Sequence, residues 1–229
     1  SLAISSLPSV FALASDGRDF LVVALANGGH AIVVTNQGGV IPRAEAIDAN
    51  QSLANPWLAW NGSRYALAYT RGFFLSHTPP EKRVTLLGSS GEVLVAPFTT
   101  PFASPAILAP GNGDVLAVYN ANGIEARHID NAGTISDAVL IRECSFGVTD
   151  VAWNGTDYYV VSNVVFRIGG TGSIALPSDA QAFALASGRG AIGIAYVRQQ
   201  PLVAIGNPII IFRANWELIP PRRARAVRP

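Results

Sequence analysis

Short apolar runs alternate with glycine-bearing polar turns along the chain, and this pattern occurs five times. In each copy an alanine is followed ten residues later by the end of a second apolar run. The five intervals run from Ala14 to Ala24, Ala59 to Tyr69, Ala109 to Tyr119, Ala152 to Ser162 and Ala186 to Tyr196. Because the runs are short, bounded by turns and rich in aromatic and β-branched residues, they predict antiparallel strands and exclude a helical repeat.

The fourth copy shows the whole unit most clearly. Asn154 and Gly155 separate two apolar runs, and this pair predicts a tight hairpin whose two central residues both have positive φ. Strands are expected over residues 148–153, 158–162, 164–168 and 173–176. The other copies repeat the order, with turns between the third and fourth strands at residues 36–39, 89–91, 130–133 and 214–216. Each unit is therefore expected to hold four antiparallel strands.

The spacing of the units predicts a five-bladed β-propeller. Successive anchor alanines lie 45, 50, 43 and 34 residues apart, near the 40 to 50 residues of one four-stranded blade. We expect a single domain over residues 1–229, with blades at about 6–48, 53–99, 104–143, 147–178 and 180–221. Residues 1–5 are expected to close the ring as a strand against the last blade, and residues 222–229 to form a basic tail or linker.

Two of the copies share a distinctive sequence motif. Residues 59–65 and 152–158 both match A-W-N-G-x-x-Y, which resembles repeats of bacterial secreted and cell-surface β-propeller proteins. The resemblance implies a propeller module of a larger exported protein with flanking domains. It implies no catalytic residue. It also implies an extracellular or cell-surface location. The signal peptide is then expected outside this sequence, because the N-terminal residues SLAISSLPS lack a charged start and an apolar centre.

Composition narrows the classes of partner. The chain has 229 residues, of which 49% are hydrophobic and 14% charged, so it can bury a substantial core. A net charge of +1 provides no basic field for nucleic acid, and no apolar run is long enough for a membrane-spanning helix. We therefore expect no nucleic acid partner and no membrane insertion. The single cysteine, Cys144, excludes an intrachain disulfide.

Ligand contacts are expected where the fourth-to-first and second-to-third strand connections emerge together, around the channel of a propeller. The second-to-third connections are long in the second and fifth copies, at residues 71–83 and 198–207. The candidate ligand-binding residues are Trp57, Tyr69, Arg71, Phe73, Phe74, His77, Arg83, Tyr119, Tyr196, Gln199 and Gln200.

Each aromatic group also has a structural interpretation. Phe73 and Phe74 alternatively begin a strand and pack in the core, whereas the three tyrosines alternatively fill space between blades with locally satisfied hydroxyls. Trp60 and Trp153 are expected to fill space between blades, because they lie at the first hairpin, away from the expected binding face.

The sequence predicts no metal site, no cofactor and no catalytic set. The three histidines fall in different copies without ligand spacing, and one cysteine cannot build a zinc site. The leading hypothesis is a non-catalytic binding or scaffolding module that recognises a protein or other ligand. The alternatives are a carbohydrate-binding, lectin-like propeller and, third, a polysaccharide-cleaving enzyme that uses Asp150 and Asp179, the carboxylates near first-strand starts.

Overall fold

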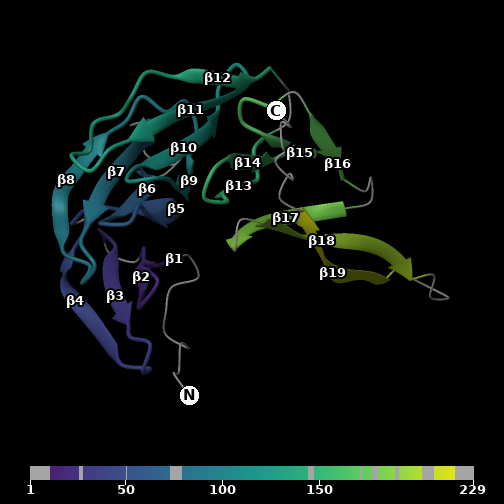
Figure 1. Cartoon of the computed structure of the whole chain (residues 1–229). Coiled ribbons are helices and arrows are strands. Elements are labelled where there is room, and N and C mark those ends of the chain that lie inside the picture. The colour runs from purple at the N-terminus through teal and green to yellow at the C-terminus, as the bar shows by residue number, and fades with distance from the viewer. Residues whose placement is uncertain are drawn as a thin grey trace, which may run out of the picture. The chain divides into compact units, whose positions relative to one another are not determined.

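The computed structural model describes residues 11–25, 28–49, 51–72, 79–143, 147–170, 172–176, 180–188, 191–202 and 209–219. In these ranges the chain folds into β-strands that form five antiparallel sheets, each made of strands consecutive in the sequence (Figure 1). The described residues contain no helix long and apolar enough to cross a membrane. The chain divides into two compact units, residues 1–145 and 146–229. A single domain over the whole chain stays a prediction.

The described residues of the first unit form three four-stranded sheets, each in the order of a simple meander. The first sheet comprises β1 (Phe11–Ser15), β2 (Phe20–Ala24), β3 (His30–Val34) and β4 (Val40–Ala46). The second comprises β5 (Leu53–Trp60), β6 (Tyr65–Arg71), β7 (Glu81–Leu87) and β8 (Val93–Thr99). The third comprises β9 (Ile107–Pro110), β10 (Val115–Asn120), β11 (Ile124–Ile129) and β12 (Val139–Arg142).

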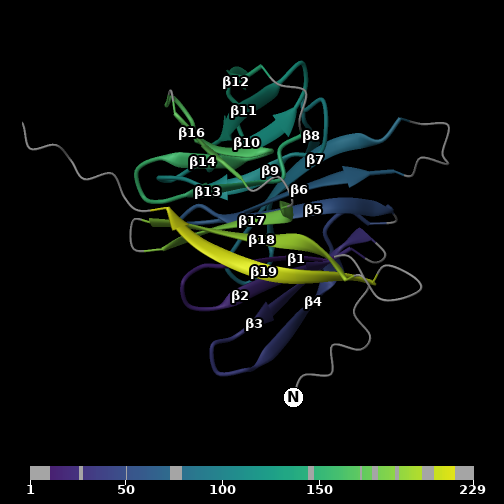
Figure 2. The same ribbon diagram turned by 90° about the vertical axis from the view of Figure 1, so that its right-hand side faces the viewer.

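The described residues of the second unit form one four-stranded and one three-stranded sheet. The fourth sheet comprises β13 (Asp150–Trp153), β14 (Tyr158–Val161), β15 (Val164–Arg167) and β16 (Ser173–Ala175). The fifth comprises β17 (Ala180–Gly188), β18 (Ala191–Leu202) and β19 (Ile209–Ile219), which Figure 2 shows side by side. The all-β prediction is confirmed, and four sheets have the four antiparallel strands expected of a blade.

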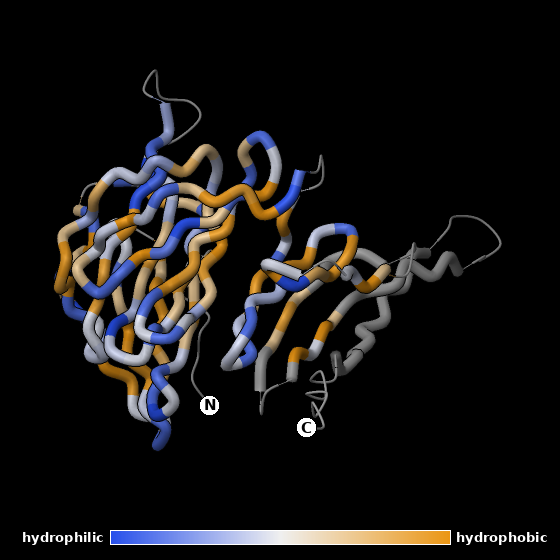
Figure 3. The backbone as a smooth tube through the Cα atoms, turned by 45° about the horizontal axis from the view of Figure 1, so that its top comes forward, coloured by the Kyte–Doolittle hydropathy of each residue, from blue (hydrophilic) through white to orange (hydrophobic). Residues whose placement is uncertain are grey.

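The second strands of the second and third sheets, β6 and β10, are buried on both faces, which explains their apolar composition. In β6, Tyr65, Leu67 and Tyr69 pack into a core cluster with the first sheet, whereas Ala66 and Ala68 pack into a cluster with the third. Hydrophilic segments gather at the turns between strands (Figure 3). β6 is therefore a strand covered on both faces, with only Arg71 at its end partly exposed.

The polar hairpins join neighbouring sheets. Asn131, in the turn between β11 and β12, accepts hydrogen bonds from Asn61 Nδ2 at 2.7 Å and from Ser63 Oγ at 2.8 Å. Its backbone carbonyl accepts a further bond from the Arg64 guanidinium. Asn61 is almost fully buried, so these bonds satisfy polar atoms that water does not reach. The A-W-N-G hairpin of the second sheet therefore holds the third sheet in place.

The predicted two-residue turn at Asn154 and Gly155 is wrong in its geometry, although the hairpin exists. Trp153 pairs with Tyr158, so the loop contains four residues, and of the two central residues only Gly155 has a positive φ, of 101°. The Asn154 side chain accepts hydrogen bonds from the backbone N–H groups of Thr156 and Asp157, at 2.9 and 2.8 Å. This Asx turn lets Asn154 remain at negative φ.

The predicted boundaries in the fifth copy are also wrong. A turn was expected at residues 214–216, but β19 is continuous from Ile209 to Ile219 and pairs with β18 throughout. The long connection expected from Arg198 is shortened as well, because β18 extends to Leu202. Gln199 and Gln200 therefore lie in a strand, where their backbones pair with Phe212 and Ile211. Residues 1–5 and 222–229 lie outside the described residues.

One face of the first sheet is apolar and exposed. Phe11, Leu13 and Phe20 are 54%, 53% and 44% exposed, and the cross-strand pairs Leu13 to Val22 and Ser15 to Phe20 place them on the same face. The opposite face of this sheet carries Ala12, Leu21 and Val23 into the core. The exposed face has the composition of a surface that packs against another sheet.

Candidate functional site

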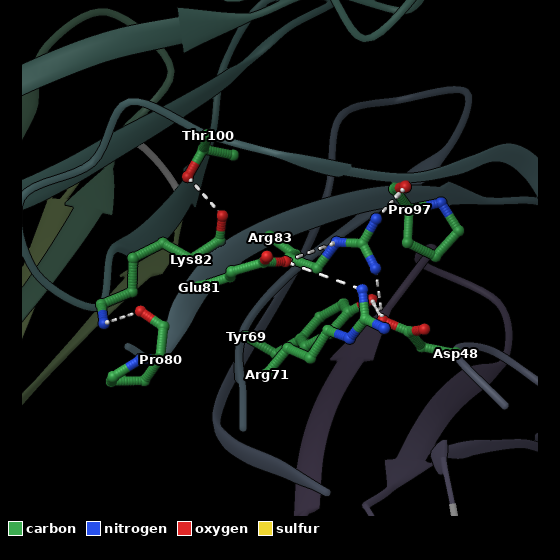
Figure 4. Close-up of polar contacts among 9 residues, drawn as sticks. All are labelled: Asp48, Tyr69, Arg71, Pro80, Glu81, Lys82, Arg83, Pro97 and Thr100. Atoms are coloured by element: carbon green, nitrogen blue, oxygen red, sulfur yellow. Dashed lines mark hydrogen bonds and ion pairs between the residues drawn. The ribbon is translucent and has the colours of Figure 1, made fainter. Parts of the chain in front are cut away.

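Five polar side chains meet beside the ends of β6 and β7 in the first unit, and we call them the Arg83 cluster: Asp48, Tyr69, Arg71, Glu81 and Arg83 (Figure 4). Tyr69 and Arg71 come from the end of β6, and Glu81 and Arg83 from the start of β7. Cross-strand pairing sets Tyr69 opposite Arg83 and Arg71 opposite Glu81. Asp48 follows β4 in the connection to the second sheet. The cluster lies at the end of the sheet where the sequence predicted ligand contacts.

Asp48 is the buried anion of the cluster. Its Oδ2 accepts a hydrogen bond from the Tyr69 hydroxyl at 2.8 Å and one from Arg83 Nη1 at 2.9 Å. Arg83 Nη2 donates to the carbonyl of Pro97 at 2.7 Å. The side chains of Arg83 and Asp48 are only 14% and 12% exposed, so this ion pair is poorly screened by solvent. Asp48 therefore links the first sheet to the second.

The two other members are closer to solvent. The side chains of Arg71 and Glu81 are 31% and 43% exposed, and Arg71 Nη1 lies 3.6 Å from Glu81 Oε2. The same Glu81 oxygen lies 4.0 Å from Arg83 Nε. Both separations permit Coulomb attraction but exceed a hydrogen bond.

Burial raises the pKa of the Tyr69 hydroxyl well above its ordinary value, and the hydrogen bond to Asp48 raises it further. Arg83 and Arg71 act in the opposite direction but are outweighed. A neutral, hydrogen-bonded Tyr69 serves to position Asp48 and is not a nucleophile.

Unfolding measurements at alkaline pH should reveal the raised pKa of Tyr69. Above about pH 10 unfolded tyrosines ionise while folded Tyr69 keeps its proton, so the free energy of unfolding should fall by about 1.4 kcal/mol per pH unit for each such tyrosine. We expect the Tyr69→Phe variant to reduce the slope of unfolding free energy against pH by that amount. Urea unfolding between about pH 9 and about pH 11 measures it. An unchanged slope in the variant would contradict a raised pKa for Tyr69.

The third sheet carries a second tyrosine with a carboxylate and an arginine. The Tyr119 hydroxyl donates to Glu125 Oε2 at 2.9 Å and accepts from Arg127 Nε at 2.9 Å. Its ring is 1% exposed and stacks on Phe102, with centroids 5.0 Å apart. Tyr69 is 3% exposed, so both tyrosines have buried rings and locally satisfied hydroxyls. That arrangement agrees with the packing interpretation of these positions.

The remaining predicted contacts are distributed as follows. Trp57 is half-buried and packs against the core between the second and third sheets, which is the opposite face of the sheet from Tyr69. Trp60 and Trp153 contact Tyr65 and Tyr158, with ring centroids 4.6 and 4.5 Å apart. The structure therefore brings together Tyr69, Arg71 and Arg83. Phe73, Phe74, His77 and the side chains of Tyr196, Gln199 and Gln200 lie outside the described part of the chain.

Sequence reasoning missed Asp48. The signal available was a lone carboxylate after Ile47 in a connection between apolar strands, where a charge requires a partner. Nothing in the sequence placed that partner 35 residues away at Arg83.

In the described part of the second unit, Asp150 has a half-buried carboxyl group at the start of β13. Its Oδ2 accepts the backbone N–H of Leu185 in β17 at 2.6 Å, and its Oδ1 accepts the N–H of Val151 at 2.8 Å. Desolvation raises the pKa of Asp150, and the two backbone hydrogen bonds oppose that rise. Burial that outweighs charge-stabilising contacts is the environment that favours a protonated carboxyl group.

No three histidine, cysteine or acidic side chains of the described residues come together as a set that could hold a metal ion. Asp179, the second carboxylate suggested by the sequence, lies outside these residues.

No protein-family model matches the chain, and no curated protein is significantly similar to it in sequence. Three similar solved structures share 8 to 11% identity with it. An exo-1,5-α-L-arabinanase from a bovine ruminal metagenomic library is 8% identical, covers 89% of this chain and 91% of its own, with a TM-score of 0.46. An α-L-arabinanase of Cellvibrio cellulosa is 11% identical, covers 89% and 90%, with a TM-score of 0.48. A subtype N11 neuraminidase-like protein (H18N11, flat-faced bat, Peru) is 9% identical, covers 90% and 69%, with a TM-score of 0.48.

The prediction of a non-catalytic binding or scaffolding module is contradicted by these similar structures, because arabinanases are enzymes. We do not retain that prediction, nor the expectation that the chain lacks catalytic activity. The similarity concerns the arrangement of strands and assigns no reaction or substrate to this chain.

Proposed function

We propose that the chain is a polysaccharide-cleaving enzyme, a glycoside hydrolase, in which Asp150 is the general acid. The observation that carries the proposal is the fixed, half-buried carboxyl group at the start of β13, held by the backbone of Leu185 in the neighbouring sheet at 2.6 Å. A carboxyl group fixed in this way retains the orientation that proton transfer requires.

The proposed reaction follows from that group. Protonated Asp150 gives its proton to the glycosidic oxygen as the bond to the anomeric carbon breaks. A water molecule then bonds to the anomeric carbon as the hydroxyl group of the new reducing end, and a second carboxylate accepts the proton that this water loses. Glycosidases of this type need a second carboxylate for water activation or nucleophilic attack. The sequence suggests Asp179 for this role.

The same proposal includes the finer fold, with the five sheets as blades of one propeller. The five-fold repeat supports it, as does the apolar face of the first sheet, since a neighbouring blade buries such a surface. The ring and its closure by residues 1–5 stay predictions.

Cleavage assays test the function. The wild type, incubated with plant and bacterial polysaccharides, should release reducing ends, and Asp150→Asn should lower the rate by about 100-fold or more. Asparagine keeps an acceptor for the Leu185 N–H, so the variant should fold. The wild-type rate should also fall as the pH rises through the raised pKa of Asp150, because the acid must be protonated.

Asp157→Asn provides the matched control. Asp157 lies in the hairpin at the other end of the same sheet, where its carboxylate pairs with Arg167 at 3.1 Å. Its replacement should leave cleavage unchanged. Wild-type rates in Asp150→Asn, or no cleavage of any polysaccharide by the wild type, would overturn the proposal.

A further inference from the structure

The solvent side of the Arg83 cluster has hydrogen-bonding groups that the described protein leaves unused. The Arg71 guanidinium makes no hydrogen bond within the described ranges, and its nearest carboxylate oxygen, on Glu81, is 3.6 Å away. The half-exposed guanidinium of Arg71 and the half-exposed carboxylate of Glu81 therefore have hydrogen-bonding capacity left for a ligand.

Arg83 contributes one more unused donor. Two of its nitrogens are satisfied by Asp48 and by the Pro97 carbonyl, which fixes the plane of the guanidinium. The third, Nε, is buried and has no hydrogen-bond partner among the described residues. It lies 4.0 Å from Glu81 Oε2. A buried donor without a partner costs free energy that a bound hydroxyl group or water would recover.

The order of these groups identifies the ligand chemistry. One oxygen of the Glu81 carboxylate faces both guanidinium groups (Figure 4). Glu81 Oε2 lies 3.6 Å from Arg71 Nη1 and 4.0 Å from Arg83 Nε, so one acceptor lies beside two donors. An anion would be repelled by Glu81 and Asp48, and a cation by Arg71 and Arg83. A neutral hydroxyl group donates one hydrogen bond and accepts up to two, which suits both kinds of partner at once. Adjacent hydroxyl groups on a sugar ring can bridge Glu81 to each arginine.

We propose that Arg71, Glu81 and Arg83 form a binding subsite for a neutral saccharide, which they hold by a vicinal pair of hydroxyl groups. This proposal adds a substrate-binding subsite to the proposed glycoside hydrolase. It depends on that function in one respect only, namely that the saccharide is taken to be part of the substrate. Asp48 and Tyr69 are positioning residues, since they orient Arg83 from the buried side.

Binding measurements separate this subsite from the catalytic proposal. Isothermal titration with cellohexaose, xylohexaose, arabinohexaose and hexagalacturonate should show binding of at least one neutral hexasaccharide to the wild type and to Asp150→Asn. Arg71→Ala and Glu81→Ala should each weaken that binding at least about tenfold, which corresponds to about 1.4 kcal/mol. Both side chains are half-exposed, so the variants should fold, as circular dichroism will verify.

Arg18→Ala is the matched control, because Arg18 is an exposed arginine in the hairpin between β1 and β2 whose ion pair with Asp19 spans 3.8 Å. It should bind like the wild type. If Arg71→Ala and Glu81→Ala both bind the neutral hexasaccharide as tightly as the wild type, the subsite proposal is wrong. It is also wrong if the wild type binds only hexagalacturonate and Glu81→Ala binds that anion more tightly. Retained binding without any cleavage would overturn the hydrolase proposal and leave the subsite standing.

Discussion

Replacing Asp48 with alanine is expected to destabilise the chain by about 3 kcal/mol, the lower end of the cost of removing one partner from a buried ion pair. The Arg83 guanidinium would keep only its bond to the Pro97 carbonyl, and the Tyr69 hydroxyl would lose its acceptor. Both groups are nearly excluded from water, so solvent cannot replace the lost contacts. Urea unfolding of wild type and variant measures the difference.

Two further variants separate charge from hydrogen bonding. Asp48→Asn keeps an acceptor for Tyr69 but removes the charge that faces Arg83, so about 1.5 kcal/mol should be lost. Arg18→Ala removes an ion pair whose arginine side chain is 83% exposed and should change stability by less than about 0.5 kcal/mol. If Asp48→Ala costs no more than Arg18→Ala, Asp48 does not couple the first two sheets.

The strands of this fold are predictable from sequence because their signals are local. Positions 65 to 69 alternate large and small apolar residues, and that alternation assigns them to the two core clusters on either side of β6. The hairpins follow from glycines whose positive φ is needed in the turn, such as Gly62 at 97°. The turn predicted in the fifth copy is wrong because the glycine signal is missing there. Residues 214–216, Ala-Asn-Trp, contain no glycine, and β19 passes straight through them.

The candidate site was only half predictable, because its members are brought together by the packing of sheets. Arg71 and Arg83 were identified from their position at the end of long-loop strands. Their partners Glu81 and Asp48 can be identified only once strand register and long-range contacts are known. Glu81 lies opposite Arg71 on the neighbouring strand, and Asp48 contacts Arg83 from the connection that follows another sheet. A sequence pattern gives periodicity along one strand and says little about which connection meets which strand end.

Gly91→Ala is expected to destabilise the chain by about 3 kcal/mol or more, through two separable effects. Gly91 has a φ of +82°, where a side chain costs about 1 to 2 kcal/mol. A Cβ there would also lie 2.8 Å from the Cβ of Ala31 and 3.2 Å from Cδ1 of Leu21. Both neighbours are fully buried in the first sheet and cannot yield without disturbing the core, which adds about 1 to 3 kcal/mol.

Gly38 provides a closely matched control for the backbone effect. Its φ is +83°, and its N–H bonds the carbonyl three residues earlier at 2.9 Å, as that of Gly91 does. A Cβ at Gly38 would meet nothing within 4 Å, so Gly38→Ala should cost only about 1 to 2 kcal/mol. Gly133, whose Cβ would lie 3.2 Å from Phe98 Cε1, should fall between them. Equal losses in all three variants would show that the turn of the second sheet does not pack on the first, because only that contact distinguishes Gly91 from Gly38.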